Sequence, residues 1–398
     1  MPYLDHAATS PLRDEAFAAM EPWLRAPAAN ASSFHGPGRR ARVAVDAARE
    51  RVAAVLGCEP GEVVFTSGGT EADNAAVRGT LTGAALRETG RPGLVTSAAE
   101  HHAVLAPARA LAAEGHPVAI LRPAPTGAVD VESVAAAVTP ETGLVSVLFV
   151  NNEVGTVTDV RAVAQVAHAG GAFCHTDAVQ AAGLFSLDVG ALGVDLLTIT
   201  AHKVGGPVGA GALFVRTGTP FAPMVLGGAQ ERGRRGGTEN VAAIVGFAEA
   251  LSLAEAERVA HASRLGVLQH RLATRLRDAL GDGLRFNTPL AGFAETPAKP
   301  SPHILSVSLR PTPAGPLDGQ MLLVGLDLDG VHVSAGSACT SGALEPSGVL
   351  LAMGVDRDTA AATVRFSLGR PTTDADVDAA ADAFVRVAGR MTAALASL

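Results

Sequence analysis

The sequence predicts an α/β protein in which a larger domain is built on a mostly parallel sheet of seven strands and a smaller domain is α+β. Three observations support this. Between about residues 60 and 216, short β-branched runs alternate with alanine-rich segments of helical spacing, which is typical of βαβ units. A glycine- and arginine-rich stretch, 227–240, then precedes a long periodic helix. With 398 residues, the chain is long enough for two domains.

Seven segments in the first part have the length and composition of buried strands. Even the longest is far shorter than the roughly 20 residues that cross a bilayer. We expect a helix over 71–81, directly after the first strand. The expected strands are 63–66, 93–96, 118–121, 144–150, 172–175, 196–199 and 212–215.

The second part mixes helices with strands and carries the chain out of the first sheet. A long helix is expected over 241–280, and an amphipathic helix over 374–395. We place the larger domain at 16–258 and the smaller one at 1–15 and 259–398. The strands expected in the smaller domain are 304–309, 331–334 and 363–367.

Composition argues against several classes of protein. The 31 basic and 39 acidic residues give a formal net charge of -8, and no basic block could follow a nucleic-acid backbone. The three cysteines are too few and too scattered for a disulfide framework or a metal site. The amino terminus lacks the basic and then apolar residues of a signal peptide. We therefore expect a cytoplasmic protein that binds no metal, no membrane and no nucleic acid.

Polar residues follow five of the seven predicted strands, where ligands collect in open α/β sheets. The first strand leads into Gly68, Gly69 and Thr70, whose free N–H groups at a helix start suit a phosphate. An ordinary tight turn can have the same sequence, so this motif alone does not distinguish a phosphate site from a turn. The other polar strand ends are 100–102, 151–153, 177–180 and 200–203.

Lys203 is one of two lysines in a chain that otherwise uses arginine. It follows a predicted buried strand next to His202, whereas Lys299 lies among prolines. A lysine amine forms imines with carbonyl cofactors, which arginine does not, and burial lowers its pKa enough to make it nucleophilic. The alternative interpretation, an ordinary surface charge, is weakened by the scarcity of lysine.

Three further residues could act on such a cofactor, and Asp177 and His101 also have a structural interpretation. Asp177 would keep a cofactor's pyridine nitrogen protonated, or it caps a helix, and the sequence allows both. Gln180 would hydrogen-bond the ring hydroxyl. His101 would stack on the ring and move protons, although a lone histidine is often structural.

Cys339 lies in a run of small residues, 334–342, that predicts a mobile loop. An exposed thiol there can become a thiolate, and a mobile loop lets it react at one site and deliver at another. Cys174, inside a predicted strand, is expected to be inert, and Cys58 lies in a turn. Without the other groups, an incidental loop cysteine would be the better interpretation.

Taken together, these segments resemble the group I cysteine desulfurases, within the class V aminotransferases of fold type I pyridoxal-phosphate enzymes. The resemblance runs nearly end to end. The motifs that carry it are 3–9, 30–33 with His35, 66–74, 100–101, 150–155, 175–180, 201–203, 235–238, 336–341 and 364–370.

The resemblance implies a role for each candidate residue. Lys203 would hold pyridoxal 5′-phosphate, Asp177 would pair with its ring nitrogen, and His101 would act at its face. Arg365, together with Asn152, would bind the substrate carboxylate. The remaining contacts would come from Asn152 and Gln180 at the ring oxygen, and from Gly69, Thr70, Thr200 and His202 at the phosphate, with Thr238 of the neighbouring subunit of a homodimer.

The implied activity converts L-cysteine to L-alanine. Cys339 would attack the substrate sulfur and keep it as a persulfide for a protein acceptor in iron–sulfur cluster assembly or in thiolation of tRNA or cofactors. A selenocysteine lyase or a class V aminotransferase would use Lys203 without Cys339, and the loop sequence argues against both. A non-catalytic paralogue acting as a binding partner is disfavoured because Lys203, Asp177, Arg365 and Cys339 are all present.

Overall fold

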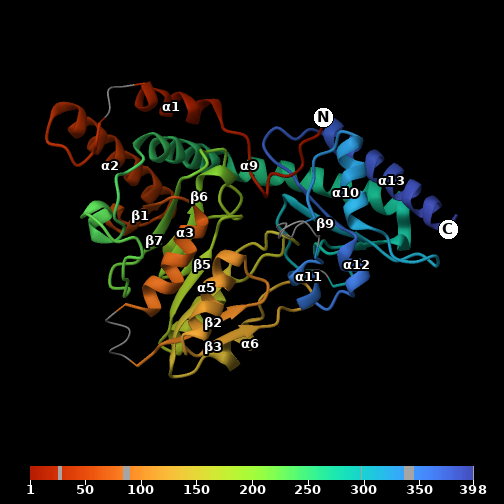
Figure 1. Ribbon diagram of the computed structural model, residues 1–398, viewed down its shortest axis with the longest axis horizontal. Coiled ribbons are helices and arrows are strands. Elements are labelled where there is room, and N and C mark those ends of the chain that lie inside the picture. Colours follow the sequence, from red (N-terminus) through yellow and green to blue (C-terminus); the bar gives the residue numbers. More distant parts are fainter. Residues whose placement is uncertain (26–28, 84–89, 297, 336–344, 398) are drawn as a thin grey trace.

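The computed structural model describes residues 1–25, 29–83, 90–296, 298–335 and 345–397. Figure 1 shows a larger sheet with its helices on one side of the molecule and a smaller body, which holds both chain ends, on the other. Separate apolar cores fill the two parts. Two separate cores are consistent with two domains. The predicted boundaries, 16–258 for the larger domain and 1–15 with 259–398 for the smaller one, stay a prediction.

The larger sheet has the predicted number of seven strands, and their order is β1-β7-β6-β5-β4-β2-β3. Strands β6, β5, β4, β2 and β3 run parallel, whereas β7 is antiparallel to both β1 and β6. Most of these strands are buried throughout, which explains why they appear in the sequence as unbroken apolar runs. The strands are β1 (Val63–Thr66), β2 (Gly93–Ser97), β3 (Val118–Leu121), β4 (Thr142–Leu148), β5 (Phe173–Asp177), β6 (Leu196–Thr200) and β7 (Gly211–Val215).

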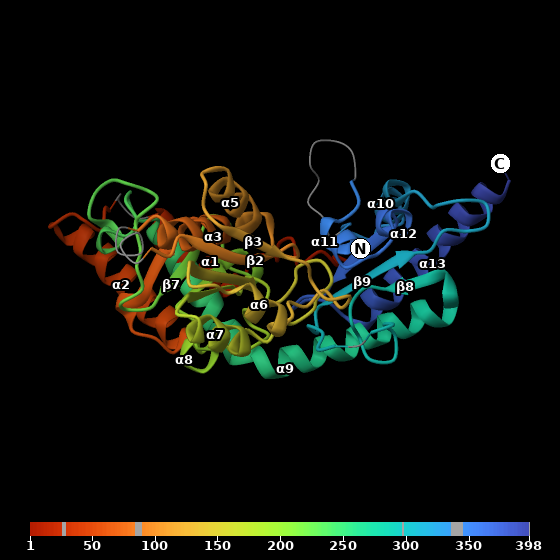
Figure 2. The same ribbon diagram turned by 90° about the horizontal axis from the view of Figure 1, so that it is seen from below.

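Helices cover both faces of this sheet. Figure 2 shows α3 and α5 above the strands, with α7, α8 and α9 below them. A segment of π-type hydrogen bonding, Ala75–Gly79, continues α3, so the helix expected over 71–81 is present. The helices of this part are α1 (Asp14–Arg25), α2 (Gly36–Leu56), α3 (Gly69–Asn74), α5 (His102–Ala113), α6 (Val131–Ala137), α7 (Val160–Ala169) and α8 (Val189–Leu192).

One long helix, α9 (Val241–Leu280), joins the two parts and confirms the helix expected there. Its first half packs in the larger core through residues such as Phe247 and Leu251. Its second half packs in the smaller core through residues such as Leu268 and Leu272. The same helix therefore fixes the separation between the two cores (Figure 2).

The smaller part is a three-stranded antiparallel sheet, β10-β9-β8, covered by helices. The strand expected at 331–334 was wrong. His332 and Ser334 form isolated bridges to two different segments, at Tyr3 and Arg365, so no continuous ladder forms. Strand β8 was missed because three residues are too few to show alternation. The elements are β8 (Leu284–Phe286), β9 (Ile304–Leu309), β10 (Thr363–Ser367), α10 (Gly319–Leu328), α11 (Gly348–Ala352), α12 (Arg357–Ala361) and α13 (Asp374–Ala396).

A buried ion pair anchors the loop between β7 and α9 to α2. Both guanidinium nitrogens of Arg49 donate to the Glu231 carboxylate over 2.7 Å, and the N–H of Phe65 donates to the same group. Glu231 and Arg232 have φ of 47° and 57°, a region that side chains disfavour. The ion pair therefore stabilises a turn in which Glu231 and Arg232 have unfavourable backbone conformations.

Changing Glu231→Gln should lower the free energy of unfolding by about 3–5 kcal/mol, because it leaves the buried Arg49 charge unpaired. Urea unfolding monitored by circular dichroism measures this. Asp378→Asn, which breaks a solvent-exposed pair with Arg271, is the matched control and should change the free energy of unfolding far less. Equal losses in the two variants would contradict a structural role for the buried pair.

Candidate active site

A cavity of about 630 Å³ lies where the ends of the large-sheet strands meet the smaller part. Its lining comes from the segments after β1, β2, β4, β5 and β6, with residues of the smaller part opposite. Parallel strands end at one edge of a sheet, which is why these distant segments meet. The predicted site residues in this lining are Gly69, Thr70, His101, Asn152, Asp177, Gln180, Thr200, His202, Lys203 and Arg365.

Lys203 follows β6 and projects into this cavity. Its Nζ donates to the carbonyl oxygens of Ala7 and Ala8, each 2.6 Å away. Burial, and then the charge of Arg365, lower the pKa of Lys203 to about 8, against the opposing effect of Asp177 and Asp5. A substantial fraction of the amine is therefore neutral near pH 8 and can act as a nucleophile.

Asp177, the last residue of β5, is buried and points its carboxylate at the cavity. Its Oδ1 accepts the N–H of Val179 over 2.9 Å. Residues 179–184 form turns and no helix follows directly, so the helix-cap interpretation of Asp177 was wrong. Burial raises the pKa of Asp177, while the Val179 N–H, His101 and Lys203 oppose the rise. A cationic ring nitrogen beside this carboxylate would keep it ionised.

Two more buried carboxyls, those of Asp73 and Glu100, lie close to Asp177, and of these two only Glu100 follows a predicted strand. Burial, and then the negative charge of Asp177, raise the pKa of Asp73 well above its usual value. The pKa of Glu100 is raised by burial and by Asp177 as well, although the N–H of Leu148 opposes this. The cluster therefore favours one ionised carboxylate among three.

The turn between β1 and α3 offers backbone N–H donors. Helix α3 starts at Gly69, and Gly68 before it supplies no side-chain cap. A Cβ on Gly69 would come within 3.0 Å of Val179 Cγ2, so a larger residue would close this approach. Thr200 lines the same cavity from the end of β6. These donors suit a phosphate group.

Two of the three histidines that line the cavity, His101 and His202, are held by hydrogen bonds. Nδ1 of His101 accepts the N–H of Ala103, which caps α5, so the proton of the neutral ring is on Nε2. Burial lowers the pKa of His101, and Asp177 opposes this. Nδ1 of His202 lies 3.2 Å from Thr9 Oγ1, and burial followed by the Lys203 charge lowers its pKa to about 4. Both rings are therefore neutral donors at pH 7.

Arg365, on β10, faces the cavity from the smaller part. It donates to Asp5 Oδ1 over 2.9 Å and to the Asn152 carbonyl over 2.7 Å. Within the described residues its Nε has no hydrogen-bond partner, although it is buried. The guanidinium is thus held in place with donor capacity left for a carboxylate.

Gln180 is fixed by a residue that the sequence analysis missed. Its Nε2 donates to the Ala7 carbonyl over 2.9 Å, and its Oε1 accepts from His303 Nε2 over 3.1 Å. The Ser301 hydroxyl completes the chain 2.6 Å from His303 Nδ1. His303 comes from a segment more than 100 residues away, so neither spacing nor a motif could have indicated it.

Two predicted site residues are not in this lining. Thr238 is exposed, in the loop before α9, and is not part of this cavity wall. Cys339 lies at 336–344, outside the described residues. The residues that flank this segment, Ser334 and Gly348, both line the cavity.

The residues present fit pyridoxal 5′-phosphate. A phosphate cradle, a buried carboxylate for a ring nitrogen, and an amine of lowered pKa share one cavity of about 630 Å³. In the part of the chain that the structure describes, no group of His, Cys, Asp and Glu could hold a metal ion. No described helix is long and apolar enough to cross a membrane.

Comparison with known proteins agrees with this geometry. Residues 2–380 match the family described as aminotransferase class-V. A cysteine desulfurase IscS of Dictyoglomus turgidum is 39% identical over 385 residues, 97% of this chain and 94% of that protein. A solved NifS-like protein superposes with a TM-score of 0.87 at 33% identity, covering 98% of this chain and 100% of that one. SspA, solved in complex with cysteine, has a TM-score of 0.76 at 30% identity, covering 92% and 99%.

The match therefore spans nearly the whole chain and includes both parts of the fold. The cradle, the carboxylate and the amine described above lie within the matched residues. The chain belongs to the aminotransferase class-V family of pyridoxal 5′-phosphate-dependent enzymes.

Proposed function

We propose that this chain is a cysteine desulfurase that converts L-cysteine to L-alanine and keeps the sulfur as a persulfide on Cys339. The observation that carries the proposal is that Ser334 and Gly348, which flank the Cys339 segment, line the same cavity as Lys203 and Arg365. The similar protein SspA has been solved in complex with cysteine, which supports the choice of substrate. The names of the curated relatives support the same activity.

Bound pyridoxal phosphate supplies an electron sink that weakens bonds at the substrate's α and β carbons. Asp177 would hold a proton on the ring nitrogen, and Asn152 and Gln180 would contact the ring oxygen. Gly69, Thr70, Thr200 and His202 would hold the phosphate. Lys203 would anchor the cofactor and move a proton at the substrate, with His101 Nε2 as a second proton donor. Arg365 and Asn152 would orient the substrate carboxylate.

Cys339 is the thiol best suited to accept sulfur. Burial raises the pKa of Cys58 to about 12, and burial and Asp195 raise that of Cys174 beyond any physiological pH. Neither forms a useful thiolate. Cys339 is five residues from Ser334, which an extended chain spans in at most about 18 Å.

The proposed sulfur transfer is a displacement at the sulfur of the substrate. The Cys339 thiolate attacks the substrate sulfur, a new S–S bond forms and the C–S bond breaks. The electron pair of the C–S bond stays on the substrate carbon, which takes up a proton and leaves as L-alanine. The persulfide then serves a protein acceptor, in iron–sulfur cluster assembly or in thiolation.

We further propose a homodimer in the cytoplasm. Thr238 is exposed and would reach the phosphate of the neighbouring subunit's cofactor. Leu226, which is 80% exposed, lies against Gly236, two residues before Thr238. An apolar side chain beside this loop would be covered in such a dimer.

Cys339→Ser should keep the yellow colour of the bound cofactor and reduce cysteine-dependent sulfide release at least about 100-fold, because the nucleophile is lost. Sulfide and alanine are measured together under reducing conditions. Lys203→Ala is the complementary variant and should lose the colour. Unchanged sulfide release by Cys339→Ser would rule out the persulfide mechanism and favour a lyase.

His303→Leu should weaken cofactor binding about 5- to 10-fold, because Gln180 loses one of two hydrogen bonds that set its amide, worth about 1 kcal/mol. Cofactor dissociation constants are measured by fluorescence. His303→Asn retains an N–H donor and should restore most of the affinity. If the Leu and Asn variants bound the cofactor equally, His303 would not position Gln180.

Asp73→Asn should stabilise the protein more at pH 8 than at pH 5. The raised pKa keeps Asp73 protonated in the fold, so unfolding releases its proton and this residue's contribution to stability falls as pH rises. Asparagine has no such proton to release. The variant should therefore gain about 1.4 kcal/mol in the free energy of unfolding for each unit by which the fold raises the pKa of Asp73. Urea unfolding at both pH values tests it. Asp130→Asn is the control, since hydrogen bonds to Ser133 lower the pKa of exposed Asp130.

A further inference from the structure

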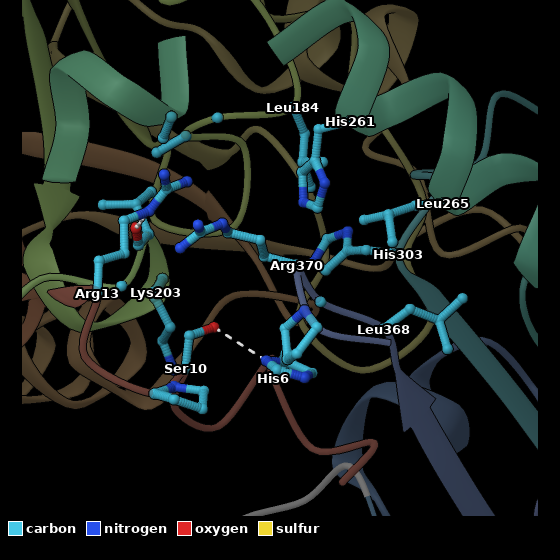
Figure 3. A pocket seen from close by; sticks show the side chains of 18 of the residues that line it. His6, Ser10, Arg13, Leu184, Lys203, His261, Leu265, His303, Leu368 and Arg370 are labelled. Atoms are coloured by element: carbon cyan, nitrogen blue, oxygen red, sulfur yellow. Dashed lines mark hydrogen bonds between the residues drawn. The ribbon is translucent and has the colours of Figure 1, made fainter. Parts of the chain in front are cut away.

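A second cavity, of about 420 Å³, shares Lys203 with the first. Figure 3 shows side chains that line this second cavity. Among the residues that the structure describes, only Val179, Gln180 and Lys203 line both cavities. The N-terminal segment, α9 and the end of the smaller part form the rest of its wall. The polar members of that wall are His6, Ser10, Arg13, Asp14, His261, His303 and Arg370.

The charges of the second cavity favour an anion. Arg13, Lys203 and Arg370 line it, against the single carboxylate of Asp14. Arg13 is fully engaged with Glu257 and the Val204 carbonyl. Arg370 is exposed, and its ion pair with Glu15 is long, at 3.7 Å. The Arg370 guanidinium therefore has N–H donors to offer a ligand.

Two imidazoles, those of His6 and His261, also belong to this wall. Nδ1 of His6 lies 3.2 Å from Ser10 Oγ, but Nε2 is buried without a hydrogen-bond partner in the described part of the chain. Only 4% of the surface of His6 is exposed. His261 is half-buried on α9. Figure 3 shows His261, His303 and Arg370 gathered around the same space as His6.

Both imidazoles are neutral in this surrounding. Burial lowers the pKa of His6 to about 4. Asp5 and the Tyr3 backbone oppose this shift, and His261 adds to it. Burial also lowers the pKa of His261 to about 4. The charges of Arg264, Arg13 and Arg370 lower this pKa further, and the charge of Glu257 opposes them. Each ring can therefore donate one N–H at pH 7 and can take up a proton when a negative charge arrives.

Other ligand classes fit this wall poorly. A cation would face Arg13, Arg370 and Lys203, and an apolar ligand would leave the buried Nε2 of His6 unpaired. An oxyanion accepts hydrogen bonds from guanidinium and imidazole together.

We propose that the second cavity binds a small oxyanion, held by the N–H donors of Arg370, His261 and His6. This site is separate from those proposed for the cofactor phosphate and the substrate carboxylate, which face the first cavity, and it goes beyond the proposed function. Because Lys203 lines both cavities, a bound anion would also act on its amine, favouring the protonated form.

Binding at this site is linked to protons. A negative charge beside His6 and His261 raises the pKa of both rings, so the bound state holds more protons than the free state. Affinity should therefore increase as pH falls from 8 to 6.

The test is calorimetric titration of the cofactor-loaded enzyme with sodium sulfate at constant ionic strength, at pH 6 and pH 8. Sulfate stays a dianion at both values, and bound cofactor fills the first phosphate site. We expect saturable binding that is at least about 10-fold weaker at pH 8. Arg370→Gln should weaken it at least about 10-fold at pH 6, and His261→Gln should reduce the pH dependence.

Arg109→Gln is the matched control, because Arg109 lines the first cavity only. It should leave sulfate binding unchanged. The proposal is overturned if sulfate does not saturate, if Arg370→Gln binds as the wild type does, or if Arg109→Gln loses binding instead. Competition by acetate would assign the site to carboxylates, and its failure to inorganic oxyanions. A colourless protein would count against the proposed function alone, because a loss of sulfate binding in Arg370→Gln but not in Arg109→Gln would still assign sulfate to the second cavity.

Discussion

The N-terminal segment 4–10 runs between the two parts of the molecule and sets the positions of the groups that matter for chemistry. The Ala7 carbonyl accepts hydrogen bonds from both Lys203 and Gln180. Asp5 holds Arg365, while the N–H of Ala7 bonds to Ser367 Oγ on the same strand. The amine from the larger part and the guanidinium from the smaller part are therefore held by one stretch of backbone. This arrangement supports the preorganisation that catalysis needs.

Burial is the main cause of the unusual electrostatics around this segment. It lowers the pKa of Lys203 and raises that of Asp177, so the bare pocket disfavours both charges. A cofactor with a cationic ring nitrogen and an anionic phosphate would compensate each of these shifts. The same surroundings keep Asp73 and Glu100 neutral, which leaves the negative charge on the carboxylate that lines the ring position. The pocket is therefore electrostatically matched to the group that its family uses.

Much of the fold could be predicted because its information is local. Each strand of the larger sheet is a short apolar run and α9 has a continuous helical period, so all were found. Prediction failed where pairing is non-local. Residues 331–334 show strand composition but pair with two separate segments, and β8 is too short to leave a pattern. His303 was missed for the same reason, since its partner Gln180 is distant in the chain.

The sequence by itself determined which chemical groups are present: one lysine after a buried strand, a carboxylate after another, and a glycine turn before a helix. These follow from local rules, because the ends of parallel strands always meet at one edge of the sheet. Only the tertiary structure decided how the groups act on one another. The grouping of three carboxyls, the support of Gln180 by His303, and the second cavity behind Lys203 all depend on contacts between distant segments. Such contacts arise from packing, which composition and periodicity do not encode.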